Sequence, residues 1–510
     1  MNGFFNLFRR FSLDRLVRIA GALACLAIQP LHAVDIGSED CGALSGQTFR
    51  GVTVTTADWL LIEPAAGQAV CVVAGHQPPY LDIEIVLPGE WSGRYVQQGG
   101  GGFDGFIQSS VLRDEHGEAV GLHEAISRFG AVRAASNGGN RQGVEGEAAP
   151  DVWFAGNSDA DRSLLHYSYL SLGVTLDFAH GLIERVYGRL PDYGYFAGCS
   201  NGGRNAYTVA QRWPQHFDGI VSGCEPMNMP GTTTAWLSFA GVQGTPAELT
   251  NEQYTHAYDA AVSACDADDG AVDGIIANPA ACGFEPQSLA CELSNAELCL
   301  SDAQVGTLEL LLSDIVDSSG NVLSSRFYWA DFGRLANAFS GLGGVYAVLA
   351  TGDAAWLQAE KRRQFAPDEH HHLIGAGLIR AGLAHDRIAI AQYVASGKKL
   401  ISWHAGADDL LTPADHARLF NDMMATAEAL AVGGGTDVHD NARFFIVPGG
   451  NHGAGVHPSV GWLEAIIEWT ENGKAPQSLT YEQADGSTIP VCRFPAYPRG
   501  TNSGYACSDG

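Results

Sequence analysis

Residues 195–204 read YFAGCSNGGR, which places Ser200 between glycines where an apolar strand passes into a helix. A serine hydroxyl becomes a nucleophile when a sharp turn holds it beside a base and near donors for the developing oxyanion, and flanking glycines permit that turn. The stretch therefore predicts a nucleophile elbow. Alone, Gly-x-Ser-x-Gly is weak evidence in a chain with 63 glycines, and Ser200 as a mere helix N-cap is the alternative.

The sequence around this stretch alternates between strand and helix patterns. Apolar strands are expected at 81–87, 94–98, 131–135, 195–199, 219–223, 399–403 and 443–447, and helices at 165–187 and 204–212. This alternation predicts a mostly parallel sheet with helices on both faces. The rhythm fails over residues 226–387, which are therefore interpreted as a lid inserted between two parts of the core, 34–225 and 388–510.

Polar loops follow the last two expected strands. HAGADD begins at position 404 and PGGNHG begins at position 448. The chain order serine, aspartate, histidine is that of α/β-hydrolases, which carry the acid and the base on loops at the carboxyl edge of the sheet. Ser200, Asp408 and His452 are therefore the predicted nucleophile, acid and base. Asp409 and His457 remain as alternatives for the acid and the base.

Acyl transfer also needs two donors for the oxyanion. The backbone amide of Asn201, directly after the nucleophile, is one candidate. The glycine run 99–102 follows an early strand, so Gly102 is the second candidate, although four glycines are equally typical of a flexible turn.

The N-terminus has the pattern of a signal peptide over residues 1–33. Four arginines precede an apolar stretch at 19–28, and the segment ends in Ala33. No later stretch is long and apolar enough to span a bilayer, so a secreted or periplasmic protein is expected. The formal net charge of −28 argues against nucleic acid or an anionic membrane as a partner, because like charges repel.

Cys25 lies in this segment, so its removal leaves ten of the eleven cysteines. An even number in an oxidising compartment suggests disulfides, although the sequence does not prove the pairs. The spacing favours four local bonds, namely Cys41 with Cys71, Cys265 with Cys282, Cys291 with Cys299 and Cys492 with Cys507. Cys199 and Cys224 are then left over.

Five segments together resemble the tannase and feruloyl esterase family, whose members include mono(2-hydroxyethyl) terephthalate hydrolases. They are GCSxGGR at 198–204, AQRWP at 210–214, FDGIV at 217–221, HxGxD at 404–408 and VPGxNH at 447–452. The resemblance runs from about Glu90 to the C-terminus. It implies an α/β-hydrolase fold with a large inserted lid domain, Ser200, Asp408 and His452 as the triad, and Gly102 and Asn201 as the oxyanion donors.

One departure from the family pattern concerns the cysteine before the nucleophile. The family pairs it with a cysteine directly after the histidine, and that position is Gly453 here. Our hypothesis is that Cys199 bonds to Cys224 instead. Two free buried thiols are the alternative.

Residues 265–275 read CDADDGAVDGI, an acidic loop that Cys282 closes. Crowded carboxylates repel one another unless a cation neutralises them, and oxygen ligands in a tight loop suit Ca²⁺. The loop lacks the EF-hand pattern, but it resembles the lid calcium loop of the family. That resemblance implies a structural calcium ion held by the side chains of Asp266, Asp269 and Asp273 and the carbonyls of Ala271 and Ile275. A solvated acidic turn is the alternative.

Three consecutive histidines, 370–372, would point in different directions on a helix or loop, so exposed surface is expected rather than a metal site.

The motifs and the resemblance together predict a secreted serine esterase acting on small aromatic esters, feruloyl (hydroxycinnamoyl) or galloyl. Hydrolysis of terephthalate monoesters is the alternative within the family. A catalytically silent, calcium-dependent binding protein is the alternative from another class.

Overall fold

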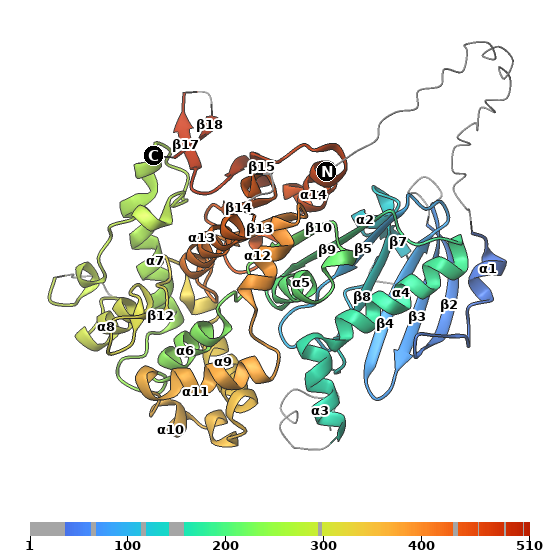
Figure 1. Ribbon diagram of the computed structural model, residues 1–510. Coiled ribbons are helices and arrows are strands. Elements are labelled where there is room, and N and C mark those ends of the chain that lie inside the picture. Colours follow the sequence, from blue (N-terminus) through green and yellow to red (C-terminus); the bar gives the residue numbers. More distant parts are fainter. Residues whose placement is uncertain are drawn as a thin grey trace, which may run out of the picture. The chain divides into compact units, whose positions relative to one another are not determined.

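A ten-stranded sheet lies at the centre of the fold in the computed structural model (Figure 1), with the order β1-β2-β3-β4-β8-β5-β9-β10-β13-β14. The structure describes residues 36–62, 68–113, 119–141, 158–293, 298–431, 437–456, 458–483, 486–502 and 504–509. The expected signal peptide 1–33 and the alternative base His457 lie outside these residues. The strands of the sheet are β1 (Thr48–Phe49), β2 (Val52–Ile62), β3 (Gln68–Gln77), β4 (Leu81–Pro88), β5 (Arg94–Gln98), β8 (Val132–Ser136), β9 (Tyr193–Cys199), β10 (Gly219–Gly223), β13 (Lys399–Ala405) and β14 (Ala442–Val447).

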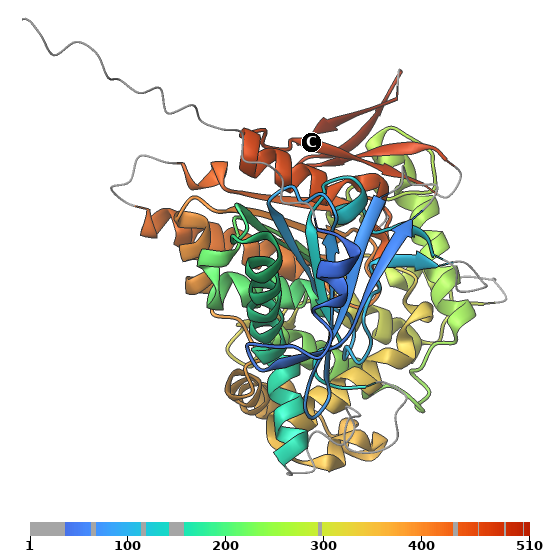
Figure 2. The ribbon, with the colours of Figure 1, turned by 90° about the vertical axis from the view of Figure 1, so that its right-hand side faces the viewer.

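The sheet is mixed, which corrects the expectation of a mostly parallel one. Strands β8, β5, β9, β10, β13 and β14 run parallel, whereas β1 to β4 pair antiparallel with one another and β4 pairs antiparallel with β8. The antiparallel strands face the viewer in blue in Figure 2. They follow one another through short connections, which allow only antiparallel neighbours. The parallel half carries the elbow.

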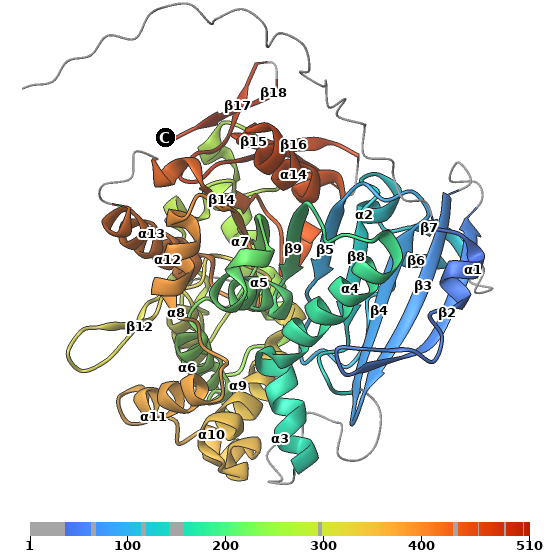
Figure 3. The same cartoon turned by 45° about the vertical axis from the view of Figure 1, so that its right-hand side comes forward.

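Helices cover both faces of the parallel half (Figure 3). Neighbouring residues of a strand point to opposite faces of the sheet, so apolar residues on each face pack against a helical layer. Phe196 of β9 packs in the core formed with α4 (Ser171–Tyr187), α5 (Asn201–Arg212), α12 (Arg387–Ala395) and α13 (Pro413–Leu430). Its neighbour Tyr195 packs in a second core formed with α14 (Trp462–Asn472).

The segment between β10 and α12, which the sequence indicates as a lid, is mainly helical. Its helices are α6 (Met229–Ala240), α7 (Asn251–Cys265), α8 (Asp302–Leu311), α9 (Ala336–Thr351), α10 (Ala359–Arg362) and α11 (Pro367–Arg380), and β11 (Ile315–Val316) pairs with β12 (Val322–Ser324). All of these helices except α10 contribute to one hydrophobic core, which also contains Leu410 and Leu411. The loop after β13 is therefore packed against this segment.

The remaining elements lie at the edges of this framework. The short helices are α1 (Ser38–Gly42), α2 (Glu124–Ser127) and α3 (Ser158–Leu165). The hairpins pair β6 (Val111–Arg113) with β7 (Ala119–Leu122), β15 (Ser478–Glu482) with β16 (Thr488–Cys492), and β17 (Tyr497–Thr501) with β18 (Gly504–Ser508). Among the helices that the structure describes, none has the length and apolar character needed to cross a membrane.

Candidate active site

Ser200 stands on a sharp turn between β9 and α5. Its backbone has φ 59° and ψ −124°, a conformation that a non-glycine residue adopts only when its surroundings hold it there. The glycines around it are needed for close packing, because a Cβ on Gly198 would collide with the backbone of Gly202. Ser200 occupies the N-cap position of α5, but its side chain makes no capping hydrogen bond. The capping alternative therefore finds no support in the contacts of this hydroxyl.

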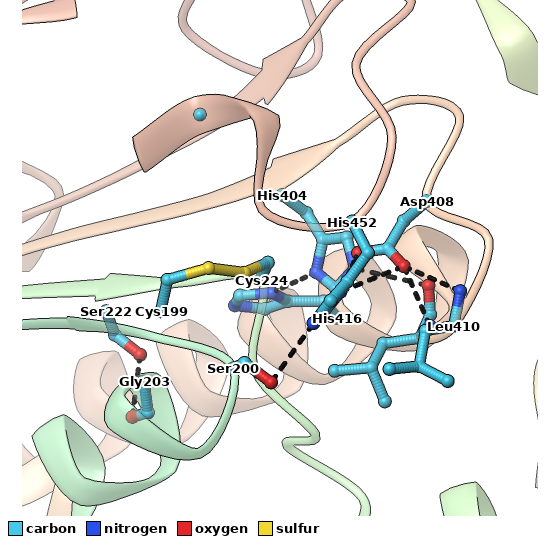
Figure 4. The surroundings of a disulfide bond; sticks show 12 residues. Cys199, Ser200, Gly203, Ser222, Cys224, His404, Asp408, Leu410, His416 and His452 are labelled. Carbon is cyan, nitrogen blue, oxygen red and sulfur yellow. Dashed lines mark hydrogen bonds and ion pairs between the residues drawn. A yellow bond between two sulfur atoms is a disulfide. The ribbon is translucent and has the colours of Figure 1, made fainter. Parts of the chain in front are cut away.

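The structure brings Ser200, His452 and Asp408 together at the carboxyl edge of the sheet (Figure 4). His452 Nε2 lies 3.1 Å from Ser200 Oγ, and His452 Nδ1 lies 2.9 Å from Asp408 Oδ2. Asp408 is fully buried, and its Oδ1 accepts the backbone N–H groups of Leu410 and Leu411 at 2.9 and 2.8 Å. The imidazole is thus held between a hydroxyl and a carboxylate.

His404 is a further neighbour of this carboxylate, and the sequence reasoning assigned it no role. Its Nε2 lies 3.1 Å from Asp408 Oδ2, and its Nδ1 lies 2.9 Å from Nδ1 of His416. The signal was present, since His404 is the first residue of the HxGxD segment. His404 lies near the end of β13 and Asp408 lies on the loop that follows, so His404 is close enough to hold the Asp408 carboxylate in position.

Electrostatics keep the acid ionised and make the base stronger. Burial alone would raise the pKa of Asp408, but the charge of His452 and the hydrogen bonds from His404 and His452 outweigh it and hold this pKa well below its ordinary value. Burial likewise opposes a charge on His452, but attraction to Asp408 and their hydrogen bond outweigh it and raise the pKa of His452. The pair therefore favours a negative carboxylate beside an imidazole that readily accepts a proton.

Asp409, the alternative acid, contacts the same histidine differently. Its Oδ1 accepts the backbone N–H of His452 at 3.0 Å, and its Oδ2 accepts Arg334 Nε at 3.1 Å. Burial raises the pKa of Asp409, which the hydrogen bond from the His452 backbone partly offsets. Asp409 therefore fixes the loop that carries the imidazole, whereas Asp408 contacts the ring.

The expected oxyanion donors lie on two segments that touch. The glycine run packs on the first turn of α5 so closely that a Cβ on Gly99 would meet the Cα of Gly202 at 2.6 Å. Gly102 has φ 57°, which favours glycine, and its carbonyl accepts the Tyr167 hydroxyl at 3.1 Å. The loop is thus held in place on both sides, which argues against the flexible-turn alternative.

Five disulfides occur among the described residues. Four join the pairs that the sequence spacing favours. The fifth joins Cys199 to Cys224, with a Cα–Cα distance of 5.3 Å (Figure 4), and leaves no support for two free thiols. It connects the residue before the nucleophile to the residue after β10.

The carboxylates of Asp266, Asp269 and Asp273 in the acidic loop influence one another: burial raises the pKa of Asp269, and the charges of Asp273 and Asp266 add to this. Asp266 accepts the backbone N–H groups of residues 273–275, and Asp273 accepts the hydroxyl of Tyr505. Asp269 Oδ2 is buried and lacks a hydrogen-bond partner within the described part of the chain. Among those same residues, no three or more His, Cys, Asp or Glu side chains are grouped so that they could hold a metal ion. A single orphaned oxygen in a set of hard donors is compatible with a cation that backbone carbonyls also bind.

The three consecutive histidines lie on α11 and do not converge. His370 packs edge-on against Trp356, and His371 Nδ1 lies 2.8 Å from Thr234 Oγ1. His372 is exposed, whereas the other two are half-buried, so the expectation of surface exposure is correct for His372 only. His371 is half-buried because it packs against Thr234 of α6, and His370 because it packs between the rings of Trp356 and Phe365.

Comparison with known proteins places this geometry in context. The family model for tannase and feruloyl esterase matches residues 65–337 and 383–508. A mono(2-hydroxyethyl) terephthalate hydrolase from Piscinibacter sakaiensis is 27% identical, over 88% of this chain and 86% of that protein. Feruloyl esterase B from Aspergillus niger is 26% identical, over 83% of this chain and 82% of that protein.

Solved structures share the fold. The feruloyl esterase B of Aspergillus oryzae superposes with a TM-score of 0.74 at 19% identity, covering 92% of this chain and 100% of that one. A tannin acyl hydrolase from Aspergillus niger superposes with a TM-score of 0.65 at 20% identity, covering 92% and 94% of the two chains.

Proposed function

Because this chain belongs to the tannase and feruloyl esterase family, whose members are carboxylic ester hydrolases, we propose that it hydrolyses esters of aromatic acids through an acyl-enzyme on Ser200. The observation that carries the proposal is the unbroken line of hydrogen bonds from Ser200 through His452 to Asp408. A catalytically silent binding protein would have no need for a serine on a strained turn beside such a base.

The mechanism follows from the positions of these groups. His452 Nε2 accepts the Ser200 proton while Oγ attacks the acyl carbon, and Asp408 stabilises the imidazolium that forms. The amides of Gly102 and Asn201 donate to the oxyanion of the tetrahedral intermediate. His452 then protonates the departing alcohol, and a water molecule that it activates cleaves the acyl-enzyme.

Aromatic side chains beside the oxyanion loop support an aromatic acyl group. Phe103 directly follows Gly102, and its ring lies 6.0 Å from the ring of Tyr167 and 5.6 Å from that of Tyr346. Trp236 lies 5.7 Å from Tyr346, and it comes from α6 of the proposed lid, residues 226–387. Tyr167, Tyr346 and Trp236 are buried in a core, so Phe103, which is partly exposed, is the ring of this cluster that is open to offset or edge-on contacts with a planar acid.

Three substrate groups remain, namely feruloyl, galloyl and terephthalate monoesters. Identity does not choose among them, because a terephthalate monoester hydrolase and a feruloyl esterase are similar to this chain to almost the same degree. The test measures kcat/KM for methyl ferulate, methyl gallate and mono(2-hydroxyethyl) terephthalate side by side, with Ser200→Ala as the control. We expect one aromatic ester to be preferred at least about tenfold and its turnover to vanish in the control. Equal activity of the Ser200→Ala protein would contradict the proposal.

We further propose a structural Ca²⁺ in the acidic loop, bound by the side chains of Asp266, Asp269 and Asp273 and the carbonyls of Ala271 and Ile275. The buried, unpartnered Oδ2 of Asp269 supports this assignment. The ion would supply positive charge that offsets the repulsion of three carboxylates, and it takes no part in the acyl transfer.

Export is the last part of the proposal. Residues 1–33 are proposed as a signal peptide that directs the protein outside the cell or to a periplasm, and five disulfides are typical of such oxidising compartments. The proposed partner is a small aromatic ester, and the acidic net charge of −28 disfavours nucleic acid and anionic membranes.

A further inference from the structure

Asp104 is a buried residue that the mechanism above does not use. It is 3% exposed and has φ 59°, a strained value for a residue other than glycine. The described residues contain three other non-glycine positions with positive φ, of which one is Ser200 itself and another is Cys224, the disulfide partner of Cys199. Strain of this kind persists where the surrounding structure enforces it, and it clusters at functional sites.

Asp104 holds the glycine loop through its backbone. Its N–H donates to the carbonyl of Gly101 at 2.8 Å. The peptide between Gly101 and Gly102 is planar, so the direction of that carbonyl sets the opposite direction of the Gly102 N–H. The carboxylate of Asp104 also receives a hydrogen bond from the backbone of Gly101. Through its own N–H, Asp104 thereby holds the Gly101–Gly102 peptide, which carries the first oxyanion donor.

The same side chain holds the residue that carries the second donor. Asp104 Oδ1 accepts Asn201 Nδ2 at 2.9 Å, and Asn201 Oδ1 accepts Arg204 Nε at 2.7 Å. The guanidinium of Arg204 is buried and donates to the carbonyls of Tyr167 and Ser168. The Asn201 side chain is therefore held from both ends, in the first turn of α5.

Two glycines lie directly against the Asp104 carboxylate. A Cβ on Gly100 would collide with Asp104 Oδ1, and a Cβ on Gly138 would collide with Oδ2. Burial raises the pKa of Asp104 to about 7, although Arg204 and the hydrogen bonds from Asn201 and Gly101 partly offset this. The fold thus retains an acid in a place where its charge is unfavourable.

We propose that Asp104 is a positioning residue that connects the peptide of Gly102 to Asn201 and so fixes the two oxyanion donors relative to each other. This rests on the proposed esterase function, in which those two amides bind the oxyanion. Asp104 touches no substrate atom and acts only through its two neighbours.

Two substitutions separate the hydrogen bond from the backbone conformation. Asp104→Asn keeps an acceptor oxygen for Asn201 and tolerates positive φ, whereas Asp104→Gly suits the same φ but removes the acceptor. We expect kcat for p-nitrophenyl acetate to fall about 10–100-fold in Asp104→Gly with KM changed less than about twofold, because oxyanion donors act mainly on the transition state. Asp104→Asn should stay within about threefold of the parent.

A transition-state analogue provides a readout that a general loss of folding would not mimic. The Ki of an aryl trifluoromethyl ketone, which forms an oxyanion on Ser200, should rise in Asp104→Gly by about the same factor as kcat/KM falls. Asn201→Ala keeps the backbone amide but removes the same hydrogen bond from the other side, so it should repeat the effect. The double variant Asp104→Gly/Asn201→Ala should lose little more than either single variant.

An unchanged kcat and Ki in Asp104→Gly, or in Asn201→Ala if the glycine variant does not fold, would overturn the positioning role. Equal losses in Asp104→Asn and Asp104→Gly would also overturn it, since the conservative variant keeps the acceptor. Ser200→Ala separates this outcome from failure of the function itself. If the parent has no Ser200-dependent activity, the esterase proposal and the positioning role fall together.

Discussion

His452 Nε2 lies 3.1 Å from Ser200 Oγ, although 252 residues separate the two in the sequence. Parallel strands bring them together, because β9, β10, β13 and β14 are consecutive neighbours in the sheet and their carboxyl ends share one edge. The loop after β14 is hydrogen-bonded to the loop after β13, through Ala407 N–H to the Gly450 carbonyl and through His452 N–H to Asp409 Oδ1. The geometry of the pair therefore depends on the whole parallel half of the sheet.

The pH dependence of turnover should report the protonation of His452. The imidazole must be neutral to accept the Ser200 proton, and Asp408 raises its pKa above the ordinary 6.5 despite burial. We therefore expect kcat/KM to fall as the pH drops through a value above 6.5 and to level off above that value. A profile for p-nitrophenyl acetate from about pH 5 to pH 9 measures this. An acidic limb centred below the ordinary histidine value would contradict it.

Asp408 and Asp409 are adjacent and offer a matched pair of substitutions. Asp408→Asn removes the charge that stabilises the imidazolium, so kcat should fall about 10³–10⁴-fold. Asp409→Asn keeps an oxygen that accepts the His452 backbone N–H, so the loss should be about tenfold or less. Steady-state measurement of kcat for both variants shows which aspartate acts as the acid of the triad. A larger loss in Asp409→Asn would reverse the assignment of the acid.

The sequence revealed the elbow and its partners because each lies at a marked boundary. Ser200 stands between glycines, and the segments with Asp408 and His452 directly follow apolar strands, so local pattern and chain order sufficed. Strands β1, β2 and β3 of the antiparallel half were not predicted from the sequence. β2 mixes alternating and irregular burial over 11 residues, and it pairs with β3 through a register shift. Patterns of this kind do not reveal pairing.

Asp104 and His404 show a second limit. The contact between Asp104 and Asn201 spans 97 positions, which no local pattern of charge or spacing expresses. His404 stands four positions before Asp408 in the HxGxD segment, but that segment alone does not show that the two side chains meet. Cys224 was the partner hypothesised for Cys199, with two free thiols as the alternative, and the structure confirms the bond. The two residues can meet because β9 and β10 lie side by side, with Gly223 opposite Cys199.

The Cys199–Cys224 disulfide should stabilise both the fold and the position of Ser200. It closes a chain segment with a sequence separation of 25, for which loop entropy predicts about 3 kcal/mol. Cys199→Ala/Cys224→Ala should therefore lower the urea midpoint and also reduce kcat, since Cys199 directly precedes the nucleophile. Cys41→Ala/Cys71→Ala is the matched control, because its sequence separation of 30 is similar and it lies away from Ser200. For the control we expect a urea midpoint as low as that of Cys199→Ala/Cys224→Ala, but a kcat equal to that of the parent. Equal kcat in both double variants would contradict the coupling to Ser200.

Calcium should stabilise the protein without taking part in catalysis. A ligand present at about 100 times its Kd adds about 2.7 kcal/mol to the free energy of unfolding, so EGTA should lower the Tm and added Ca²⁺ should restore it. Asp269→Asn weakens the buried ligand and should abolish most of this shift, while kcat at low temperature stays close to that of the parent.

Asp268→Asn is the matched control, because Asp268 is exposed in the same loop and should leave the Ca²⁺-dependent shift intact. Thermal unfolding of the three proteins with EGTA and with Ca²⁺ measures the effect. Since Asp269 is buried and its Oδ2 has no other partner among the described residues, a full shift in Asp269→Asn would mean that the cation binds elsewhere.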